Sequence, residues 1–405
     1  KKAGTGTEAL QKCRVDTETE ALQKCRGRTE TDRKAYSMTE PIRVLHVLGG
    51  LSIGGAESRI MDLYRNMDRE KIQFDFLIHT TEKQHFEEEV TKLGGKIYRV
   101  PRFKVYNWFS YEKALKQFFS HHKEFRAVHG HMTSTASIYL PIAKKAGIPI
   151  TIAHSRSAGV DGGIKGVTTK ILRRSLKHKA DYCLACSKEA GEAVFGKKWV
   201  EQGKVQVIPN AIETEKYVYD IKAREDMRES LGLAGRLVIG HVGSFRTPKN
   251  HVFLLDVFAE IYKRNPAARL ILVGEGPLMP EIKEKAKQLG LSEVVLFTGN
   301  QSKVSDYYQT FDILIFPSLY EGLPGTVVEA QVSGLKCLIS DAITKEVDIT
   351  ELVHRMSLAD TAEEWTIAAM QMLPYERKSH LEEVNAAGFS IREQAKRYEE
   401  LYGCK

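Results

Sequence analysis

The sequence predicts an α/β protein built from two doubly wound, Rossmann-like domains. From residue 43 onward, short runs rich in Val, Ile and Leu alternate with amphipathic stretches. This alternation is typical of parallel sheets with helices on both faces. It stops at a polar stretch after Pro209 and starts again at Leu237, and a chain of 405 residues is long enough for two such cores.

The first series of elements predicts an N-terminal domain over residues 38–212. Its helices are expected at 57–67 and 86–93, with others between the later strands. Its strands are expected at 43–48, 73–79, 127–131, 150–154, 182–187 and 205–208. Residues 213–236 are polar apart from one short helix, and we interpret them as a linker.

The second series predicts a C-terminal domain over residues 237–388. Its strands are expected at 237–242, 269–273, 294–297, 312–316 and 336–340, separated by helices. A last helix is expected at 391–402, within a C-terminal segment of residues 389–405. In open sheets of this kind, ligands bind beyond the carboxyl ends of the strands.

Residues 1–37 are set apart from the fold. The octapeptide TEALQKCR occurs at 7–14 and again at 19–26, in a polar segment without apolar periodicity. Such a short repeat ahead of Met38 is interpreted as derived from a tag or vector, and it is expected to be disordered.

Composition indicates a cytoplasmic globular protein. Apolar residues make up 42% and charged residues 28%, and no apolar run reaches the roughly 18 residues that span a bilayer. No secretion signal is evident, and six cysteines do not form a disulfide framework at this length. Cys183 and Cys186 have C-x-x-C spacing without a second pair, so we interpret them as small apolar residues of a buried strand.

The stretch from Phe311 to Gly334 carries the most functional information. A buried strand is expected at 312–317, followed by a turn with glycine and proline and by a helix from Thr326. Glu321 lies in the turn, and Glu329 lies eight positions further on. The backbone amides of residues 322–327 are expected to point out of the helix start, where phosphate binds readily. By itself, the pattern fits two interpretations equally well. One is a ligand site with two carboxylates, and the other is a solvated glutamate in a turn followed by an ordinary glutamate at the start of a helix.

The segment EGLPGTVVE resembles the E-x(7)-E signature of retaining GT-B glycosyltransferases of family 4, the glycosyl transferases group 1. The resemblance extends from about residue 42 to 402. It includes LHVLGGLSIGGAE near the start, VHGHM at 128–132, VGSFRTPKNH at 242–251 and LILVGEGPL at 270–278. The resemblance implies a GT-B fold, an acceptor domain followed by a donor domain, and a final helix that returns to the first domain.

The resemblance also implies roles for three residues near the reacting atoms. Glu321 is expected to bind a hydroxyl of the donor sugar, and Lys249 to neutralise the diphosphate that leaves. His131, at the end of a predicted strand, is expected to contact the transferred sugar. Its neighbour His129 is more readily interpreted as a packed strand residue, and a structural role stays open for His131 as well.

Further residues are expected to bind the substrate. Glu329 matches the position that accepts the ribose hydroxyls. The remaining candidates are Gly54, Gly55, His154, Arg246, Gly322, Leu323, Pro324, Gly325, Thr326 and Val327. Gly54 and Gly55 are also compatible with a purely structural turn. Relatives commonly carry an Arg where this chain has Ser244, and whether Arg246 replaces it stays open.

No cofactor or metal is expected. The chain has no D-x-D pair to hold a divalent ion, so Lys249 and helix dipoles are expected to neutralise the diphosphate. Residues 168–181 form a basic amphipathic stretch that fits either contact with anionic lipid or a solvated helix face. The protein is therefore expected in the cytoplasm or as a peripheral protein on the cytoplasmic face of the plasma membrane, without nucleic-acid partners.

The sequence thus predicts a retaining hexosyltransferase that uses a nucleotide sugar, most plausibly UDP-linked, and a saccharide or polyprenyl-linked acceptor. The segment ELVHRMSLADTAEEW resembles bacterial exopolysaccharide and capsule enzymes, which implies a role in polysaccharide biosynthesis. A GT-B sugar-nucleotide epimerase and an inactive nucleotide-sugar-binding homologue are the alternatives. The donor sugar, acceptor, linkage and oligomeric state are not predicted.

Overall fold

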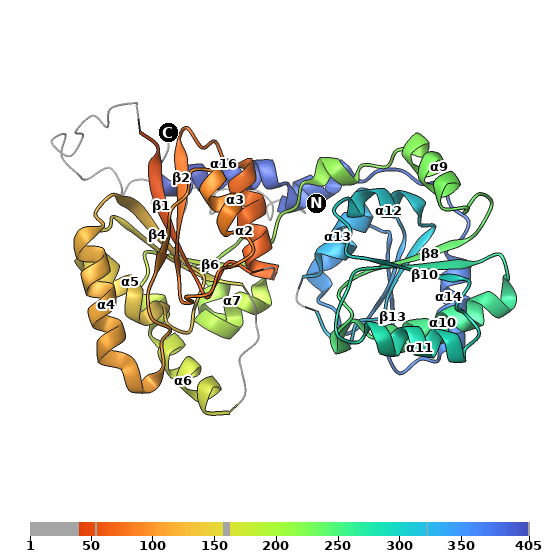
Figure 1. Cartoon of the computed structure of the whole chain (residues 1–405), viewed down its shortest axis with the longest axis horizontal. Helices are drawn as coiled ribbons and strands as arrows, with labels where there is room; N and C mark the ends of the chain where they lie inside the picture. The colour runs from red at the N-terminus through yellow and green to blue at the C-terminus, as the bar shows by residue number, and fades with distance from the viewer. Residues whose placement is uncertain (1–39, 53–54, 157–162, 322, 404–405) are drawn as a thin grey trace, which may run out of the picture. The chain divides into compact units, whose positions relative to one another are not determined.

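The computed structural model describes residues 40–52, 55–156, 163–321 and 323–403 and contains two all-parallel sheets, each covered by helices (Figure 1). The expectations for residues 1–37, Gly54 and Gly322 lie outside the described residues. The two-domain α/β prediction is confirmed.

The first sheet has seven strands in the order β3-β2-β1-β4-β5-β6-β7. Its strands are β1 (Ile42–Leu48), β2 (Ile72–Ile78), β3 (Ile97–Arg99), β4 (Phe125–Gly130), β5 (Ile150–Ser155), β6 (Tyr182–Ala185) and β7 (Gln206–Val207). Its helices are α2 (Gly55–Asn66), α3 (Glu87–Lys92), α4 (Trp108–His121), α5 (Ala136–Lys145), α6 (Gly163–Arg174), α7 (Lys188–Phe195) and α8 (Lys197–Glu201). Short 3₁₀ turns η2 (Val105–Asn107) and η3 (Leu176–His178) precede α4 and follow α6.

The second sheet has six strands in the order β10-β9-β8-β11-β12-β13. Its strands are β8 (Val238–Val242), β9 (Arg269–Val273), β10 (Val295–Gly299), β11 (Ile313–Phe316), β12 (Cys337–Ser340) and β13 (Val353–Met356). Its helices are α9 (Ile221–Ser230), α10 (His251–Arg264), α11 (Met279–Gln288), α12 (Val304–Thr310), α13 (Gly325–Val332), α14 (Ala362–Gln371) and α15 (Leu381–Val384). The turns η4 (Thr214–Tyr217), η5 (Thr247–Lys249) and η6 (Lys345–Val347), the segment η7 (Asn385–Phe389) and helix α16 (Ile391–Tyr402) complete the chain.

Each sheet is buried on both faces, which is why its strands appear in the sequence as continuous apolar runs. Along β1, Val44 packs with α2 and α16 on one face, and Leu45 packs with α4 and α5 on the other. In the second sheet, Ile239 and Val238 divide in the same way between two apolar clusters. Side chains that alternate along the strands therefore supply four apolar layers.

In both sheets the chain changes direction beside the first strand of the domain. The strand order reverses between β1 and β4 in the first sheet and between β8 and β11 in the second. Loops from neighbouring strands leave such a switch point toward opposite faces, so a ligand can reach the carboxyl ends of the strands there. The predicted site residues follow these four strands, except His154, which lies on β5.

Two short strands were not predicted from the sequence pattern, and the short helix expected in the linker packs with the second domain. β3 and β13 are edge strands with the sequences IYR and VHRM, in which charged residues interrupt the apolar run. The stretch interpreted as a linker contains α9, whose Arg228 donates a hydrogen bond to the Thr310 carbonyl oxygen at 2.8 Å. Since Thr310 ends α12, α9 packs with the helices of the second sheet.

Helix α16 completes the core of the first sheet. Its residues Ile391, Ala395, Tyr398 and Tyr402 belong to the same apolar cluster as Val44 of β1. The helix, blue in Figure 1, lies beside β2 and α2. Ser390 caps it by accepting a hydrogen bond from the Glu393 amide.

The middle of β8 tolerates no side chain at Gly240. A Cβ atom placed there would lie only 2.1 Å from the Phe311 ring, which is itself buried in the second core. The sheet therefore requires glycine at this position for close approach.

We expect Gly240→Ala to destabilise the protein by about 1–3 kcal/mol, because overpacking forces the Phe311 ring or the strand to move. Urea unfolding followed by circular dichroism measures the loss. In Phe311→Leu the smaller side chain should accommodate the new methyl group, so the double variant should lose less than the two single losses added together. Additive losses would show that the two positions do not meet.

Candidate active site

Lys249 and Glu321 form an ion pair at the switch point of the second sheet. Lys249 ends η5 after β8, and Glu321 lies in the loop after β11. The Lys249 Nζ lies 2.6 Å from Glu321 Oε1 and 4.6 Å from the centre of the Phe316 ring. Both side chains are only 17% exposed, so water screens this pair less than a surface pair. Two residues that are 72 positions apart in the sequence are thus brought together as expected.

Gly243 leaves the space that the Lys249 side chain occupies. A Cβ atom at position 243 would lie 3.2 Å from the Lys249 Cδ and Cε atoms. The neighbouring loop is held in place by the Leu319 amide, which donates to the Pro248 carbonyl oxygen at 2.8 Å. The lysine stem is therefore packed between the two loops, and its ammonium group points to Glu321.

Helix α13 begins directly after this loop, with Pro324 as its N-cap residue. The Thr326 hydroxyl donates to the Val242 carbonyl oxygen at 3.2 Å and so fixes the helix start against the end of β8. Gly325 and Thr326 belong to the first turn, whose amides have no partner within the helix. The Val327 amide, by contrast, donates to the Pro324 carbonyl oxygen at 3.1 Å, so it is already used inside the turn.

Glu329 is buried beneath the first turn of α13. Its Oε2 accepts a hydrogen bond from the Tyr308 hydroxyl at 2.8 Å, and its Oε1 would lie 3.6 Å from a Cβ at Gly325. Burial raises the pKa of Glu329 above its usual value. A desolvated carboxylate with one oxygen near the helix start is a good acceptor for hydroxyl groups.

The other candidates of this loop differ in exposure. Arg246 is exposed, as is Ser244, while Phe245 between them is buried in the core. Leu323 is half-buried and packs against the second core, and Pro324 is buried. The structure therefore leaves Arg246 at the surface beside η5, while Lys249 contacts Glu321.

Four histidines gather at the switch point of the first sheet. His46 lies on β1, His129 on β4, His131 directly after β4, and His154 on β5. All four are buried, and burial lowers the pKa of each ring below its usual value, to about 3 for His46. The cluster is therefore neutral.

Hydrogen bonds define the tautomer of His131. The Arg156 Nε, which can only donate, lies 3.2 Å from His131 Nδ1. A neutral His131 then carries its proton on Nε2 and donates it to His46 Nδ1 at 3.0 Å. Both nitrogens of His131 are thus engaged, and a sugar hydroxyl can bind this ring only by replacing a partner. Of its two partners, Arg156 is more exposed than His46.

A second chain of hydrogen bonds links the other two rings to the last helix. The Tyr402 hydroxyl lies 2.7 Å from His129 Nδ1, and His129 Nε2 lies 3.0 Å from His154 Nδ1. His129 is therefore a structural residue, as the sequence favoured. His154, predicted to bind substrate, is fully buried behind it.

Ring nitrogens of His46, His129 and His131 lie within 4.8 Å of one another, which is close enough for one metal ion to reach all three. Five of their six nitrogens already serve the hydrogen bonds to His154, Tyr402, Arg156 and one another, whereas His46 Nε2 is buried without a hydrogen-bond partner. The absence of a metal requirement stays a prediction of the sequence.

Sequence reasoning missed several residues of the site. His46 and Tyr308 complete the two groups described here, yet they lie 85 and 21 positions from the residues that they contact. Buried polar residues on otherwise apolar strands were the available signal for His46. Gly55 begins α2, and Gly54 lies outside the described residues.

Comparison with known proteins agrees with this architecture. Residues 53–216 match the model described as Glycosyltransferase Family 4, and residues 236–373 match Glycosyl transferases group 1. EpsF of Bacillus subtilis strain 168, named as a glycosyltransferase, is 38% identical over 328 residues, which are 80% of this chain and 85% of EpsF. The capsular polysaccharide biosynthesis glycosyltransferase CapH of Staphylococcus aureus is 24% identical and covers 90% of this chain and 99% of its own.

A UDP-Gal:alpha-D-GlcNAc-diphosphoundecaprenol alpha-1,3-galactosyltransferase of Escherichia coli is 27% identical over 54% of this chain and 58% of its own length. Among solved structures, Anabaena HepE in complex with UDP-glucose superposes with a TM-score of 0.66 at 16% identity. That match covers 89% of this chain and all of the HepE chain.

Two Rossmann-like domains with these matches define a GT-B glycosyltransferase. The chain belongs to glycosyltransferase family 4, the glycosyl transferases group 1, and one of its relatives, CapH, is named for capsular polysaccharide biosynthesis. The family recognised from the sequence motifs is therefore confirmed.

The neutral histidines predict a loss of stability in mild acid. The unfolded chain protonates histidine near pH 6.5, while burial keeps the folded pKa of His46 at about 3. The contribution of such a histidine to the free energy of unfolding is therefore fully present above about pH 6.5 and is lost as the pH drops toward 3. At about pH 5.5 the loss is about 1.4 kcal/mol per histidine. Urea unfolding at about pH 7.5 and 5.5 should show this fall.

The variant His46→Asn keeps an acceptor near the position of Nδ1 but cannot titrate. Its stability should change less between the two pH values than that of the parent protein, whatever its absolute stability. His354 is exposed, so His354→Asn serves as the control and should keep the parent pH dependence. Equal pH dependence in His46→Asn and the parent would contradict the assignment.

Proposed function

We propose that this protein transfers a sugar from a UDP-linked donor to a saccharide or lipid-linked acceptor, with retention of anomeric configuration and without a metal ion. The observation that carries the proposal is the Lys249–Glu321 pair beside the first turn of α13. An ammonium group, free helix amides and two carboxylates lie at one switch point, a combination that fits a diphosphate flanked by sugar hydroxyls.

Lys249 acts on the leaving group. As the bond between sugar and diphosphate breaks, negative charge develops on the departing oxygen, and an ammonium group already fixed in a partly buried site stabilises it. The pairing with Glu321 keeps the ammonium in place before the donor binds. The amides of Gly325 and Thr326 supply further positive potential at the helix start.

The two carboxylates bind hydroxyl groups rather than metal. Glu321, next to the ammonium, accepts a hydroxyl of the donor sugar and favours the positive charge that develops on the anomeric carbon. Glu329, held by Tyr308, accepts the two ribose hydroxyls. Retention follows when the acceptor attacks from the face that the diphosphate leaves, and the departing phosphate oxygen takes the acceptor proton.

His131 lies at the carboxyl edge of the first sheet, where the proposed function places the acceptor. Its Nδ1 lacks a proton because Arg156 donates to it, so it can accept a hydrogen bond from a sugar hydroxyl that replaces Arg156. His46 keeps this tautomer by accepting the proton of Nε2. The ring thereby recognises a hydroxyl without introducing a charge near the anomeric carbon.

The relatives support the choice of substrates. HepE was solved with UDP-glucose, and the E. coli relative is named for a UDP-galactose donor and a diphosphoundecaprenol-linked acceptor. A lipid-linked acceptor would bring the enzyme to the cytoplasmic face of the membrane as a peripheral protein. None of the helices in the described part of the chain combines the length and apolarity needed to cross a bilayer.

The alternatives make different products. An epimerase of the same fold would convert the nucleotide sugar without any acceptor, and an inactive homologue would bind the donor without turnover. Exposed Ser244, where relatives commonly carry Arg, is the sequence feature that favours the inactive homologue. Release of UDP that depends on added acceptor separates the proposed transferase from both.

A thermal-shift screen of nucleotide sugars tests the donor. A ligand at a hundredfold excess over its Kd stabilises the folded state by about 2.7 kcal/mol, and UDP sugars should raise the Tm more than GDP or ADP sugars. Glu329→Gln, which removes the charge but not the volume, should lose most of this shift. Glu351→Gln, a change at an exposed glutamate, is the control. An undiminished shift in Glu329→Gln would remove Glu329 from the ribose role.

Turnover at saturating donor tests the leaving-group role. We expect Lys249→Met to lower kcat by about 10²- to 10³-fold, because a preorganised charge is lost where charge develops. Lys263→Met removes an exposed ammonium that pairs with Glu260 and should keep the parent rate. Proton NMR of the first product formed should show the anomeric configuration of the donor. Unchanged kcat in Lys249→Met would exclude this role for Lys249, and an inverted product would exclude retention.

A further inference from the structure

Five large apolar side chains are gathered on one side of the first domain, at η2, at the start of α4 and on α6. They are Val105, Tyr106, Phe109, Val167 and Ile171. Tyr106 and Phe109 are 83% and 85% exposed, and Ile171 is 67% exposed. Isolated apolar residues at a surface need no explanation, but a group with aromatic tips indicates a contact surface.

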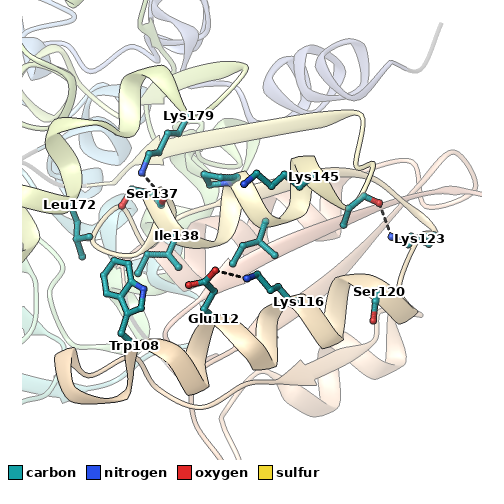
Figure 2. A pocket seen from close by; sticks show the side chains of 13 residues that line it. Trp108, Glu112, Lys116, Ser120, Lys123, Ser137, Ile138, Lys145, Leu172 and Lys179 are labelled. Atoms are coloured by element: carbon teal, nitrogen blue, oxygen red, sulfur yellow. Dashed lines mark hydrogen bonds and ion pairs between the residues drawn. The ribbon is translucent and has the colours of Figure 1, made fainter.

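Two hollows join these segments although they are some sixty residues apart in the sequence. One, of about 530 Å³, lies between Phe103 and Tyr106 on one side and Thr168 and Leu172 on the other. The second, of about 600 Å³, lies between α4, α5 and α6 (Figure 2). Leu172 lines both, so the α4 and α6 segments form one continuous surface.

The second hollow is lined by both apolar and basic side chains. Trp108, Ile138 and Leu172 line it together with the basic residues Lys116 and Lys179 (Figure 2). Lys179 donates to the Ser137 carbonyl oxygen at 3.0 Å, a contact that places the ammonium without cancelling its charge. This arrangement suits a ligand with an apolar part beside an anionic part.

The charge around the five apolar residues is almost all positive. Segments 102–123 and 167–179 contain ten Lys or Arg residues and a single acid, Glu112. Glu112 is paired with Lys116 at 2.7 Å. On the aromatic side, the Lys104 ammonium lies 5.6 Å from the centre of the Tyr106 ring. Basic residues around exposed aromatic and aliphatic tips match the headgroup region of an anionic bilayer.

We propose that this surface, the α4–α6 face, docks the protein onto an anionic lipid bilayer. Phe109, Tyr106 and Ile171 insert at the level of the headgroups, and the surrounding Lys and Arg residues contact lipid phosphates. The sequence pointed only to a basic stretch at 168–181. The apolar tips that turn charge attraction into insertion come largely from the separate segment 105–109.

The position of the face suits the lipid-linked acceptor of the proposed function, which this inference deepens. Met132, directly after His131, lines the hollow between Tyr106 and Leu172. The Arg173 guanidinium donates to the Thr133 hydroxyl at 3.0 Å and ties α6 to the same loop. The docked face therefore adjoins the carboxyl end of β4, where an acceptor carried by a membrane lipid would arrive.

Vesicle sedimentation tests docking without any turnover, so its result is separate from that of the catalytic proposal. The whole protein should bind vesicles of phosphatidylcholine with about 40% phosphatidylglycerol at least tenfold better than pure phosphatidylcholine. Phe109→Ser combined with Ile171→Ser should weaken binding about tenfold or more at low salt, because two inserted side chains are lost. Lys170→Glu combined with Arg174→Glu should weaken it by a similar factor.

The double variant Ile221→Ser and Lys222→Glu is the matched control, because both residues lie on α9 and are exposed. It should bind as the parent does. Unfolding curves should show that all variants are folded. Equal binding of the parent to anionic and neutral vesicles, or unchanged binding of both face variants, would overturn the proposal. If the parent protein does not bind vesicles but associates with itself through this face, the membrane proposal is overturned and the partner is a second copy of the chain.

Insertion depth gives an independent measurement. Trp199, which is only partly buried and contacts Lys177, is first replaced by Phe, so that Trp108 and Trp365 are the tryptophans left. In this Trp199→Phe protein, lipids brominated near the headgroup should quench Trp108 fluorescence, while Trp365, buried in the second core, should be unaffected. The quenching should disappear when Trp108→Phe is added. Quenching that persists in this variant would place the inserted surface elsewhere and overturn the assignment.

Discussion

The uniform direction of the strands is the constraint on which the rest of this structure depends. All strand pairs in both sheets are parallel, so every carboxyl end within a sheet lies at the same edge. At the two switch points this edge opens between diverging loops. Residues that are scattered through the sequence, such as Lys249 and Glu321, meet there because each follows a strand that ends at the opening.

The carboxyl edges of the two sheets differ in the charge of the side chains that line them. The edge of the first sheet is lined by neutral rings, whose burial is compatible with stability only because they exchange hydrogen bonds with one another and with Tyr402. The edge of the second sheet holds charges, each partly solvated or paired, as at Lys249 and Glu321. A neutral edge suits hydroxyl recognition, and a charged one suits a diphosphate. This difference between the side chains of the two edges agrees with the proposed function, in which the first sheet receives the acceptor and the second sheet receives the donor.

The sequence pattern predicted the elements whose signal is local and missed those that depend on long-range pairing. The strand at 269–273 has the predicted bounds, because its apolar run alone defines it, and the helix at 391–402 has the bounds that the family resemblance implied. β3 and β13 have only three and four residues and contain Arg, so they are strands only because a neighbouring strand pairs with them. Likewise, the motif indicated Glu329, while its partner Tyr308 became visible only when α12 was placed beside α13.

The position of α16 has a consequence for how the protein is made. Its residues Ile391, Ala395, Tyr398 and Tyr402 complete the apolar layer over β1 and β2, although they are synthesised long after these strands. At about 5–20 residues per second, a ribosome needs about 10–40 s to add the chain between residues 212 and 402. During that interval one apolar face of the first sheet is covered by α2 but lacks the side chains of α16. The first domain is therefore synthesised first but completes its core only after the second domain has been made. A chaperone that acts during synthesis would bind the exposed apolar surface of this first domain.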